Sequence, residues 1–304
     1  MFTSYPDSGD SLWSPLIYNY ETTSESDLEF IIINQVVEDD TYVKKLYDAT
    51  SASINVAPLF RYSSMPKLTA RTTNFYAATD GYASVVTYCQ GNASSQRIFT
   101  LAKEPVSYGD MMTSMPLDRL ISPGESDIIR LFTTPNQSVT AYVLAIDQED
   151  VTNSAMLGDY SLQGDHDGVV DFVFQCPDVD NESVRVIIKY SDNTAIITYY
   201  LTNYDNLGES VRLAWLSSAG SIEHHTFPIV RDKSIYRDGT YHYTLLSAYA
   251  PELYIESIAG IVSSSMVWII EDEEYRRIEV ESEVAPIKDN GSLSYLELKI
   301  VDNG

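Results

Sequence analysis

Short runs in which apolar and polar residues alternate recur along most of this chain, and the period of an amphipathic helix is almost absent. Alternation with a period of two places every second side chain on the same face of a β-strand. Clusters of Asp, Asn, Gly, Ser and Pro separate the runs, as expected for turns between strands. The pattern predicts an all-β protein with two or more β-sandwich domains, Ig-like or jelly-roll-like, and little helix.

The clearest predicted unit is a hairpin in which Val184–Tyr190 and Ala195–Leu201 are joined by a tight turn at Asp192 and Asn193. One short helix is predicted over Pro251–Ile258, with proline in its first turn. The other predicted strands are Leu28–Val37, Tyr42–Tyr47, Ser53–Ala57, Tyr82–Cys89, Arg97–Leu101, Asp127–Phe132, Val139–Ile146, Val169–Gln175, Val211–Ser217, Ser221–Phe227, Tyr241–Leu246, Met266–Ile270, Arg277–Glu283 and Leu293–Val301.

The segment Lys103–Gly124 breaks the alternation, because prolines, glycines and three methionines interrupt it. We interpret it as a long loop or linker. Met111, Met112 and Met115 either contact a partner, since methionine adapts to irregular grooves, or cover the core of their own chain. We expect the partner contact, and we expect Met112→Asp to impair assembly while leaving the fold intact. The predicted division is an N-terminal β domain at 1–103, a linker or long loop at 104–125, a central β-sandwich at 126–229 and a small C-terminal β domain at 230–304.

Charge and cysteine content narrow the classes of function. The 304 residues carry a formal net charge of −25. Such a surface repels nucleic acid, so we expect no specific nucleic-acid binding; a charge that only keeps the protein soluble gives the same composition. Cys89 and Cys176 are expected to be buried free thiols. The start of the chain lacks the features of a signal peptide, and no apolar run is long enough to span a membrane, so we expect folding in a cytoplasm and no membrane insertion.

The motifs that mark nucleotide-binding loops, hydrolase nucleophiles and zinc proteases do not occur in the sequence. We therefore expect no enzyme activity, no catalytic residue and no cofactor. Adjacent strand residues face opposite ways, so His224 and His225 do not readily bind one metal, and we expect a surface pair at a strand end. Asp165, Asp167 and Asp171 form a weak calcium candidate around a glycine-rich turn, and the alternative is a solvated turn.

One predicted hairpin resembles a hairpin found in a known protein family. Segment 211–227 resembles a hairpin of tail and tail-ring proteins from phages that infect Bacteroidetes, including crAss-like phages. The pattern is matched by Arg212, Trp215, Gly220, Glu223, Thr226 and Phe227, while His224-His225 stands where the family has an aromatic pair. Segment 261–270 resembles a strand of the same group, and Trp13–Tyr18 resembles its opening strand.

The resemblance implies a virion structural protein of a phage tail, connector or tail-barrel ring, assembled in the bacterial cytoplasm. Its implied partners are other copies of itself in a ring, together with tail or portal proteins. The matched residues carry structure rather than catalysis, so Trp215 and Phe227 are expected in the hairpin core. An alternative is a surface binding module, such as a fibre, adhesin or carbohydrate-binding domain, with Tyr199-Tyr200 or Tyr241–Tyr243 as an aromatic platform. A polysaccharide hydrolase would need two carboxylates held across a cleft.

Overall fold

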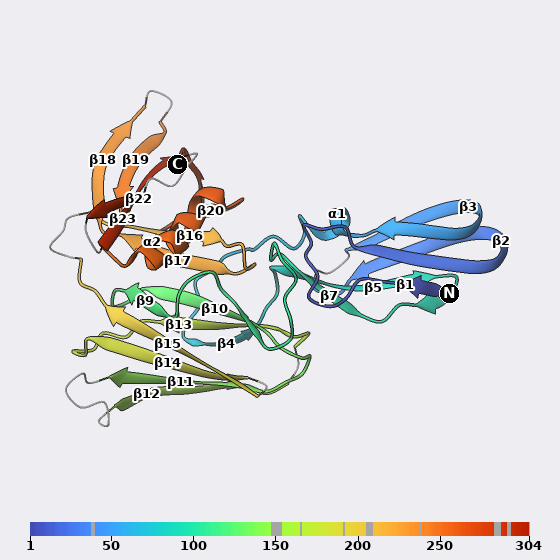
Figure 1. Cartoon of the computed structure of the whole chain (residues 1–304), viewed down its shortest axis with the longest axis horizontal. Coiled ribbons are helices and arrows are strands. Elements are labelled where there is room, and N and C mark those ends of the chain that lie inside the picture. The colour runs from blue at the N-terminus through green and yellow to red at the C-terminus, as the bar shows by residue number, and fades with distance from the viewer. Residues whose placement is uncertain are drawn as a thin grey trace.

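The computed structural model contains many strands and few helical residues. It describes residues 1–37, 40–146, 154–164, 166–190, 192–204, 209–236, 239–282, 287–290 and 293–303. The strands form sheets in three units, as Figure 1 shows, so the protein is all-β with sandwich architecture and little helix. Within the described residues, no helix has the length and apolar character needed to cross a membrane.

The N-terminal unit is built on one long ribbon. Its sheet has the order β1-β2-β5-β6, with β3 paired to β2 and β7 paired to β5. The pairing of β2 with β3 is interrupted between Glu21 and Leu28, and there the ribbon turns back on itself. Tyr20 and Phe30, from the two halves of β2, consequently meet with ring centroids 6.0 Å apart. The elements are β1 (Phe2–Ser4), β2 (Ile17–Asn34), β3 (Thr41–Asn55), α1 (Ala57–Phe60), β5 (Tyr82–Cys89), β6 (Asn92–Ala93) and β7 (Arg97–Thr100).

The central unit is a sandwich of two sheets whose facing side chains form one apolar core. Phe172 from one sheet and Val186 from the other are both fully buried in this core. The first sheet has the order β4 (Asn74–Ala77), β13 (Val169–Gln175), β10 (Ser126–Phe132), β8 (Asp110–Met112). The second has the order β12 (Ala155–Leu162), β11 (Val139–Ile146), β14 (Ser183–Tyr190), β15 (Asn193–Leu201), β9 (Asp118–Ile121).

The C-terminal unit is a strongly curled sheet with one helix packed inside it. Ile255 and Ile258 of the helix are buried together with Trp215 and Leu298 of the sheet. The sheet has the order β17 (Ile222–Phe227), β16 (Val211–Leu216), β20 (Val267–Glu271), β21 (Glu274–Val280), β23 (Leu293–Asp302), β19 (Tyr241–Leu246), β18 (Ile229–Ile235), and β22 (Ile287–Asn290) pairs with β23. The helix α2 (Glu252–Ala259) continues into a 3-10 turn over Gly260–Ser263.

The sheets cross the domain bounds that the sequence suggested. Strand β4 lies within 1–103 but pairs with β13 of the central sandwich. Strands β16 and β17 lie within 126–229 but belong to the C-terminal sheet. Segment 104–125 contains the short strands β8 and β9 rather than loop alone. Alternation shows that a strand exists, but it does not show which distant strand will be its partner, and this is why these assignments differ.

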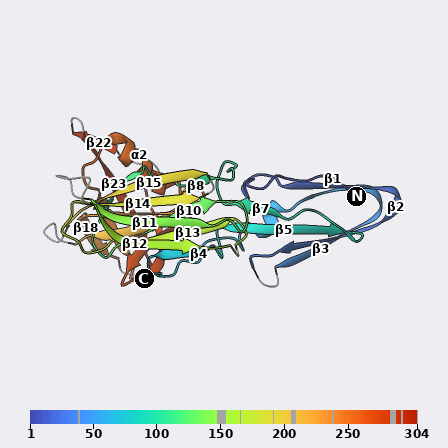
Figure 2. The ribbon, with the colours of Figure 1, turned by 90° about the horizontal axis from the view of Figure 1, so that it is seen from below.

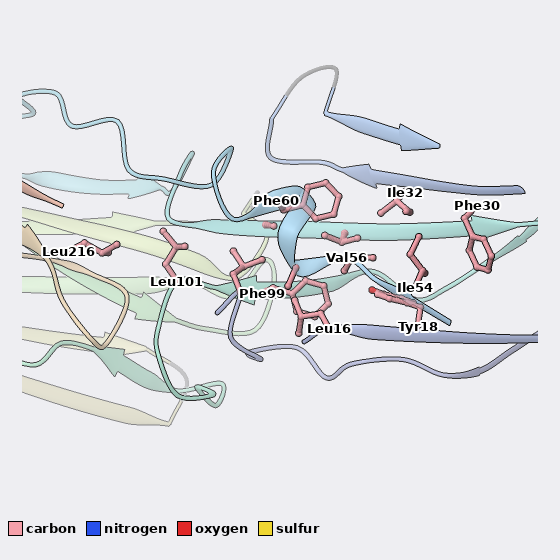
Figure 3. Close-up of a cluster of buried hydrophobic side chains, with 14 of the residues drawn as sticks. Leu16, Tyr18, Phe30, Ile32, Ile54, Val56, Phe60, Phe99, Leu101 and Leu216 are labelled. Carbon is pink, nitrogen blue, oxygen red and sulfur yellow. The ribbon is translucent and has the colours of Figure 1, made fainter. Parts of the chain in front are cut away.

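Apolar packing joins the units into one body. Leu101 at the base of the N-terminal unit lies in the same buried cluster as Leu216 and Trp268 of the C-terminal sheet. Figure 3 shows Leu216 and Leu101 continuing the row of side chains that runs through Phe99 toward Phe30. Figure 2 shows the N-terminal unit extending away from the other two along the long axis. The buried contact makes an elongated molecule with a defined arrangement of its units.

Candidate functional site

A cluster of buried charges lies where the central sandwich meets the C-terminal sheet. Arg119 comes from β9, Asp127 from β10, and Glu223 and His224 from β17; we call these four residues the junction cluster. All four are buried. Strand β17 packs across β10, and this contact brings residues separated by about a hundred positions in the sequence together.

Arg119 is the centre of this cluster. Its Nη1 lies 2.5 Å from Asp127 Oδ2, its Nη2 donates to Thr113 Oγ1 at 2.7 Å, and its Nε donates to the Pro116 carbonyl at 3.0 Å. Burial disfavours an ionised carboxylate, but the adjacent guanidinium more than offsets this and holds the pKa of Asp127 well below its usual range. Tyr199 also donates its hydroxyl to Asp127 Oδ2 at 2.7 Å. Arg119 and Asp127 therefore form a charged, hydrogen-bonded pair that is buried from solvent.

Glu223 holds the segment before β9 against β17. Its Oε1 accepts hydrogen bonds from the Thr113 hydroxyl at 2.8 Å, the Ser114 backbone N–H at 2.9 Å and the Ser221 hydroxyl at 2.8 Å. Its Oε2 lies 3.7 Å from Arg119 Nη1 and accepts no hydrogen bond from the described residues. One carboxylate thus orders a loop of the central unit on a strand of the C-terminal unit.

The two adjacent histidines are buried on opposite faces of β17, and the expectation of a surface pair is wrong. His224 Nδ1 lies 3.3 Å from Asp127 Oδ1, on the face that meets the central sandwich. His225 Nδ1 lies 3.2 Å from the hydroxyl of Tyr254, inside the C-terminal core. Both faces of β17 are covered, which sequence alternation alone does not reveal. Burial lowers the pKa of His224, and it lowers that of His225 to about 3, so both imidazoles are neutral near pH 7.

The hairpin residues singled out by the resemblance are structural in this fold. Trp215 and Phe227 are fully buried in the C-terminal core. Arg212 Nη1 lies 2.8 Å from Glu125 Oε2, an ion pair between β16 and the central unit. Gly220 has a φ of +81°, and a Cβ there would lie 2.4 Å from the backbone nitrogen of Ala102. The turn of this hairpin therefore packs directly on the base of the N-terminal unit.

The three methionines lie inside the chain, which corrects the expectation that they contact a partner. Met112 is buried among residues at the junction of the N-terminal and central units. Met115 is buried in the C-terminal core, and Met111 is half-buried against the central core. The pairing of β8 with β10 places Met111 and Met112 against the body of the chain, and Met115 follows in the segment between β8 and β9. The arrangement matches the other interpretation of this segment, in which the methionines cover the cores of their own chain.

Asp167 and Asp171, the described members of the calcium candidate, have different partners. Asp171 is buried and both of its oxygens bind Arg130, at 2.7 and 2.8 Å. Asp167 Oδ1 accepts a hydrogen bond from the Gln96 amide at 3.4 Å, and Asp165 lies outside the described residues. Among the side chains that the structure describes, no group of three or more His, Cys, Asp and Glu is arranged to hold a metal ion. Asp171 is held by Arg130 because a buried carboxylate requires a countercharge.

Tyrosine residues meet in a cleft of about 400 Å³ between the central and C-terminal units. We name it the tyrosine cleft and define it by Pro116, Tyr200, Tyr249, Leu253 and Tyr254, with Asp118 at its rim. Of the tyrosines proposed as a platform, Tyr200 is exposed there, whereas Tyr199 and Tyr243 are buried. The sequence did not indicate that the start of α2 would close this cleft.

Comparison with known proteins does not assign a function to these sites. The sequence matches no model of a known protein family and no curated protein. A solved structure of a tetra-tandem repeat in the extending region of a large adhesion protein is 11% identical, covers 80% of this chain and 68% of that chain, and has a TM-score of 0.21. An Ig1-Ig2 structure of Dpr2 in complex with DIP-Theta is 8% identical, covers 99% of this chain and 88% of that chain, and has a TM-score of 0.18. Scores this low carry no argument about function.

Proposed function

We propose that this chain is a structural protein that works by packing its sheet edges against other protein chains. In its more specific form, the proposal is a component of a phage virion, in a tail, connector or tail-barrel ring made of identical subunits. The observation that supports it best is the exposed edge strand β18.

Strand β18 ends the largest sheet and pairs only with β19 among the described strands. Every residue of β18 is exposed or half-buried, and Val230 packs against the C-terminal core. Ile229 and Ile235 are among its exposed side chains, and Ile235 is 65% exposed. An edge with exposed apolar side chains can pair with another chain, although Arg231, Asp232, Lys233 and the register shift between Val230 and Asp232 are features that limit such pairing.

Two other units have comparable edges. In the N-terminal unit β3 pairs only with β2 among the described strands, and it exposes Val43 and Tyr47. In the central unit β12 ends its sheet and exposes Met156 and Leu157. Edges on units that are packed into one body give a subunit several contact surfaces in fixed relative positions. Closed rings require this of their subunits.

Charge and resemblance support the more specific form of the proposal. A chain of net charge −25 binds DNA poorly, so it suits the wall of a channel through which DNA or cargo protein slides. The hairpin resemblance to tail-ring proteins rests on residues that form β16, β17 and the turn between them. The proposal assigns no catalytic residue and no cofactor, and it locates the protein in the virion.

Sedimentation velocity of the full chain tests the packing proposal. Wild-type protein is expected to form larger species as its concentration rises, and Ile235→Lys is expected to shift that equilibrium toward the single chain. Tyr62→Lys is the control, because Tyr62 is 80% exposed and lies outside every strand. A wild-type protein that stays a single chain at all soluble concentrations, alone and with purified tail proteins, would overturn the proposal.

A surface binding module is the second candidate, and the tyrosine cleft is the observation that favours it. Its exposed aromatic and apolar side chains form a concave surface of the kind that ligands occupy. A glycan array distinguishes the two functions, because a carbohydrate-binding module would retain specific sugars and a ring subunit would not.

A further inference from the structure

We propose that the tyrosine cleft binds an extended, proline-containing segment of a partner protein that carries a basic residue next to its prolines. This binding site goes beyond the edge-to-edge packing proposed above and does not require the chain to form a ring.

Several exposed apolar side chains surround this cleft. Tyr200 comes from β15, Tyr249 from the segment that leads into α2 and Leu253 from the first turn of α2, and all three are exposed. Leu117, next to the lining residue Pro116, is exposed as well. A contiguous exposed apolar surface that is also concave is typical of an interaction site rather than of ordinary solvent-facing sheet.

Strand β9 ends its sheet, but its outer edge is partly covered. On one side β9 pairs with β15 in parallel. On the other side the backbone N–H of Leu120 donates to the hydroxyl of Tyr254 at 3.4 Å, and β9 also lies against β17. An occupant therefore gains little affinity from backbone hydrogen bonds along β9 and binds mainly through its side chains. A polyproline II segment fits, because its backbone makes no internal hydrogen bonds and stays solvated.

The size and chemistry of the cleft disfavour two other occupants. A volume of about 400 Å³ holds a few side chains rather than one face of a long helix. A sugar ring stacked on the tyrosines would have Asp118 and the tyrosine hydroxyls as its main hydrogen-bond partners, and each ring hydroxyl buried without a partner would cost free energy. Proline rings are apolar and already fixed in φ, so they lose little conformational entropy on binding.

The rim of the cleft selects for positive charge. Asp118 is exposed, and the ion pairs between described residues leave it out. The neighbouring Arg119 does not neutralise it, because its guanidinium is committed to Asp127 and Thr113 inside the junction cluster. The charge of −25 on the whole chain attracts basic segments toward this rim. An Arg or Lys beside the proline residues would pair with Asp118.

The test uses the full chain and an array of immobilised Pro-x-x-Pro peptides, each made with a flanking arginine and with alanine in its place. The best-retained peptide is then measured in solution by fluorescence anisotropy. Tyr200→Ala and Tyr249→Ala are each expected to weaken binding about tenfold, because aromatic side chains dominate such contacts. Asp118→Asn is expected to weaken it about twofold to fivefold and to reduce its salt dependence. Tyr62→Ala is the control and should bind like the wild type.

Circular dichroism of each variant confirms the fold, which these exposed positions should preserve. The proposal is overturned if the wild type retains no peptide more strongly than the Tyr200→Ala/Tyr249→Ala double variant does. Sugar binding that disappears in the same variants would assign the cleft to a carbohydrate instead. Self-association that disappears in them would assign it to a second copy of the chain. Peptide binding is measured on the single chain, so failure of ring assembly would leave this result unchanged.

Discussion

Arg119 and Asp127 form an ion pair with Nη1 and Oδ2 2.5 Å apart, and their side chains are only 3% and 5% exposed. Removal of one partner from such a pair leaves the other charge buried without compensation. In this chain Glu223 would also lose its nearest cation, because its Oε2 lies 3.7 Å from the same guanidinium nitrogen. The ion pair thus holds β9, β10 and β17 in one arrangement.

Arg119→Met is therefore expected to lower the free energy of unfolding by about 3–5 kcal/mol. Chemical denaturation followed by tryptophan fluorescence measures the change. The matched control is Glu29→Gln, which removes a pair with Lys45 whose side chains are about half exposed. It should change stability by less than about 1 kcal/mol. Equal effects of the two substitutions would mean that the junction cluster does not hold the units together.

Acid should destabilise the protein through its buried histidines. In the folded chain burial lowers the pKa of His225 to about 3, against 6.5 for an ordinary imidazole. Below about pH 6.5 the unfolded chain takes up a proton that the folded chain does not, so stability falls by about 1.4 kcal/mol per pH unit for this group. His224 acts in the same direction. Asp127 lowers stability only at more acidic pH, because the unfolded chain protonates this carboxylate only near its usual pKa while the folded chain keeps it ionised.

His225→Phe removes one of these titrations while keeping a ring next to Phe227 and Tyr254. Denaturation at about pH 7 and at about pH 5 should show a smaller loss of stability in the variant, by about 1.4 kcal/mol per pH unit. An identical loss in the wild type and the variant would show that His225 is not buried as described.

Gly220→Ala tests the contact between the C-terminal hairpin and the N-terminal unit. The control is Gly91→Ala, since Gly91 has a similar φ of +77° and open space where the Cβ would lie. Gly91→Ala should cost about 1–2 kcal/mol from backbone strain alone. Gly220→Ala should cost more, because the new Cβ would also press on the backbone of Ala102. A thermal melt that ranks the two variants equally would contradict this packing.

Met112→Asp now has a different expected outcome from the one that the sequence suggested. Met112 is 1% exposed, so the new carboxylate would be buried without a partner. We expect loss of the cooperative fold rather than impaired assembly of an intact subunit. A soluble variant with a wild-type melting temperature would restore the earlier interpretation of a partner contact.

The sequence predicts many strands well and their partners poorly. Strands β11, β13 and β19 begin and end at the predicted residues, since their alternating or continuous apolar runs are bounded by clear turn signals. Strand β12 was missed because Gly158 and Asp159 weaken its pattern, and β9 was missed because it is short and follows Pro116. Pairings such as β4 with β13 depend on contacts between distant segments, which local patterns do not encode.

The junction cluster shows the same limit at the level of single residues. Glu223 was noted only as part of a hairpin pattern, and Arg119 lay in a segment interpreted as a loop. The one local signal was that Glu223, His224 and His225 lie in a strand that begins with Ile222 and ends with Phe227. Polar residues on both faces of a strand usually indicate solvent, and only the packing of β17 between two units makes them buried.

The central claim is that this chain works as one subunit among others, and a direct measurement of assembly tests it best. Purified full-length protein should be examined by negative-stain electron microscopy together with mass measurement in solution, alone and mixed with tail and portal proteins. The account predicts a closed ring of identical subunits or a specific complex with those proteins. A solitary chain under all of these conditions would contradict it.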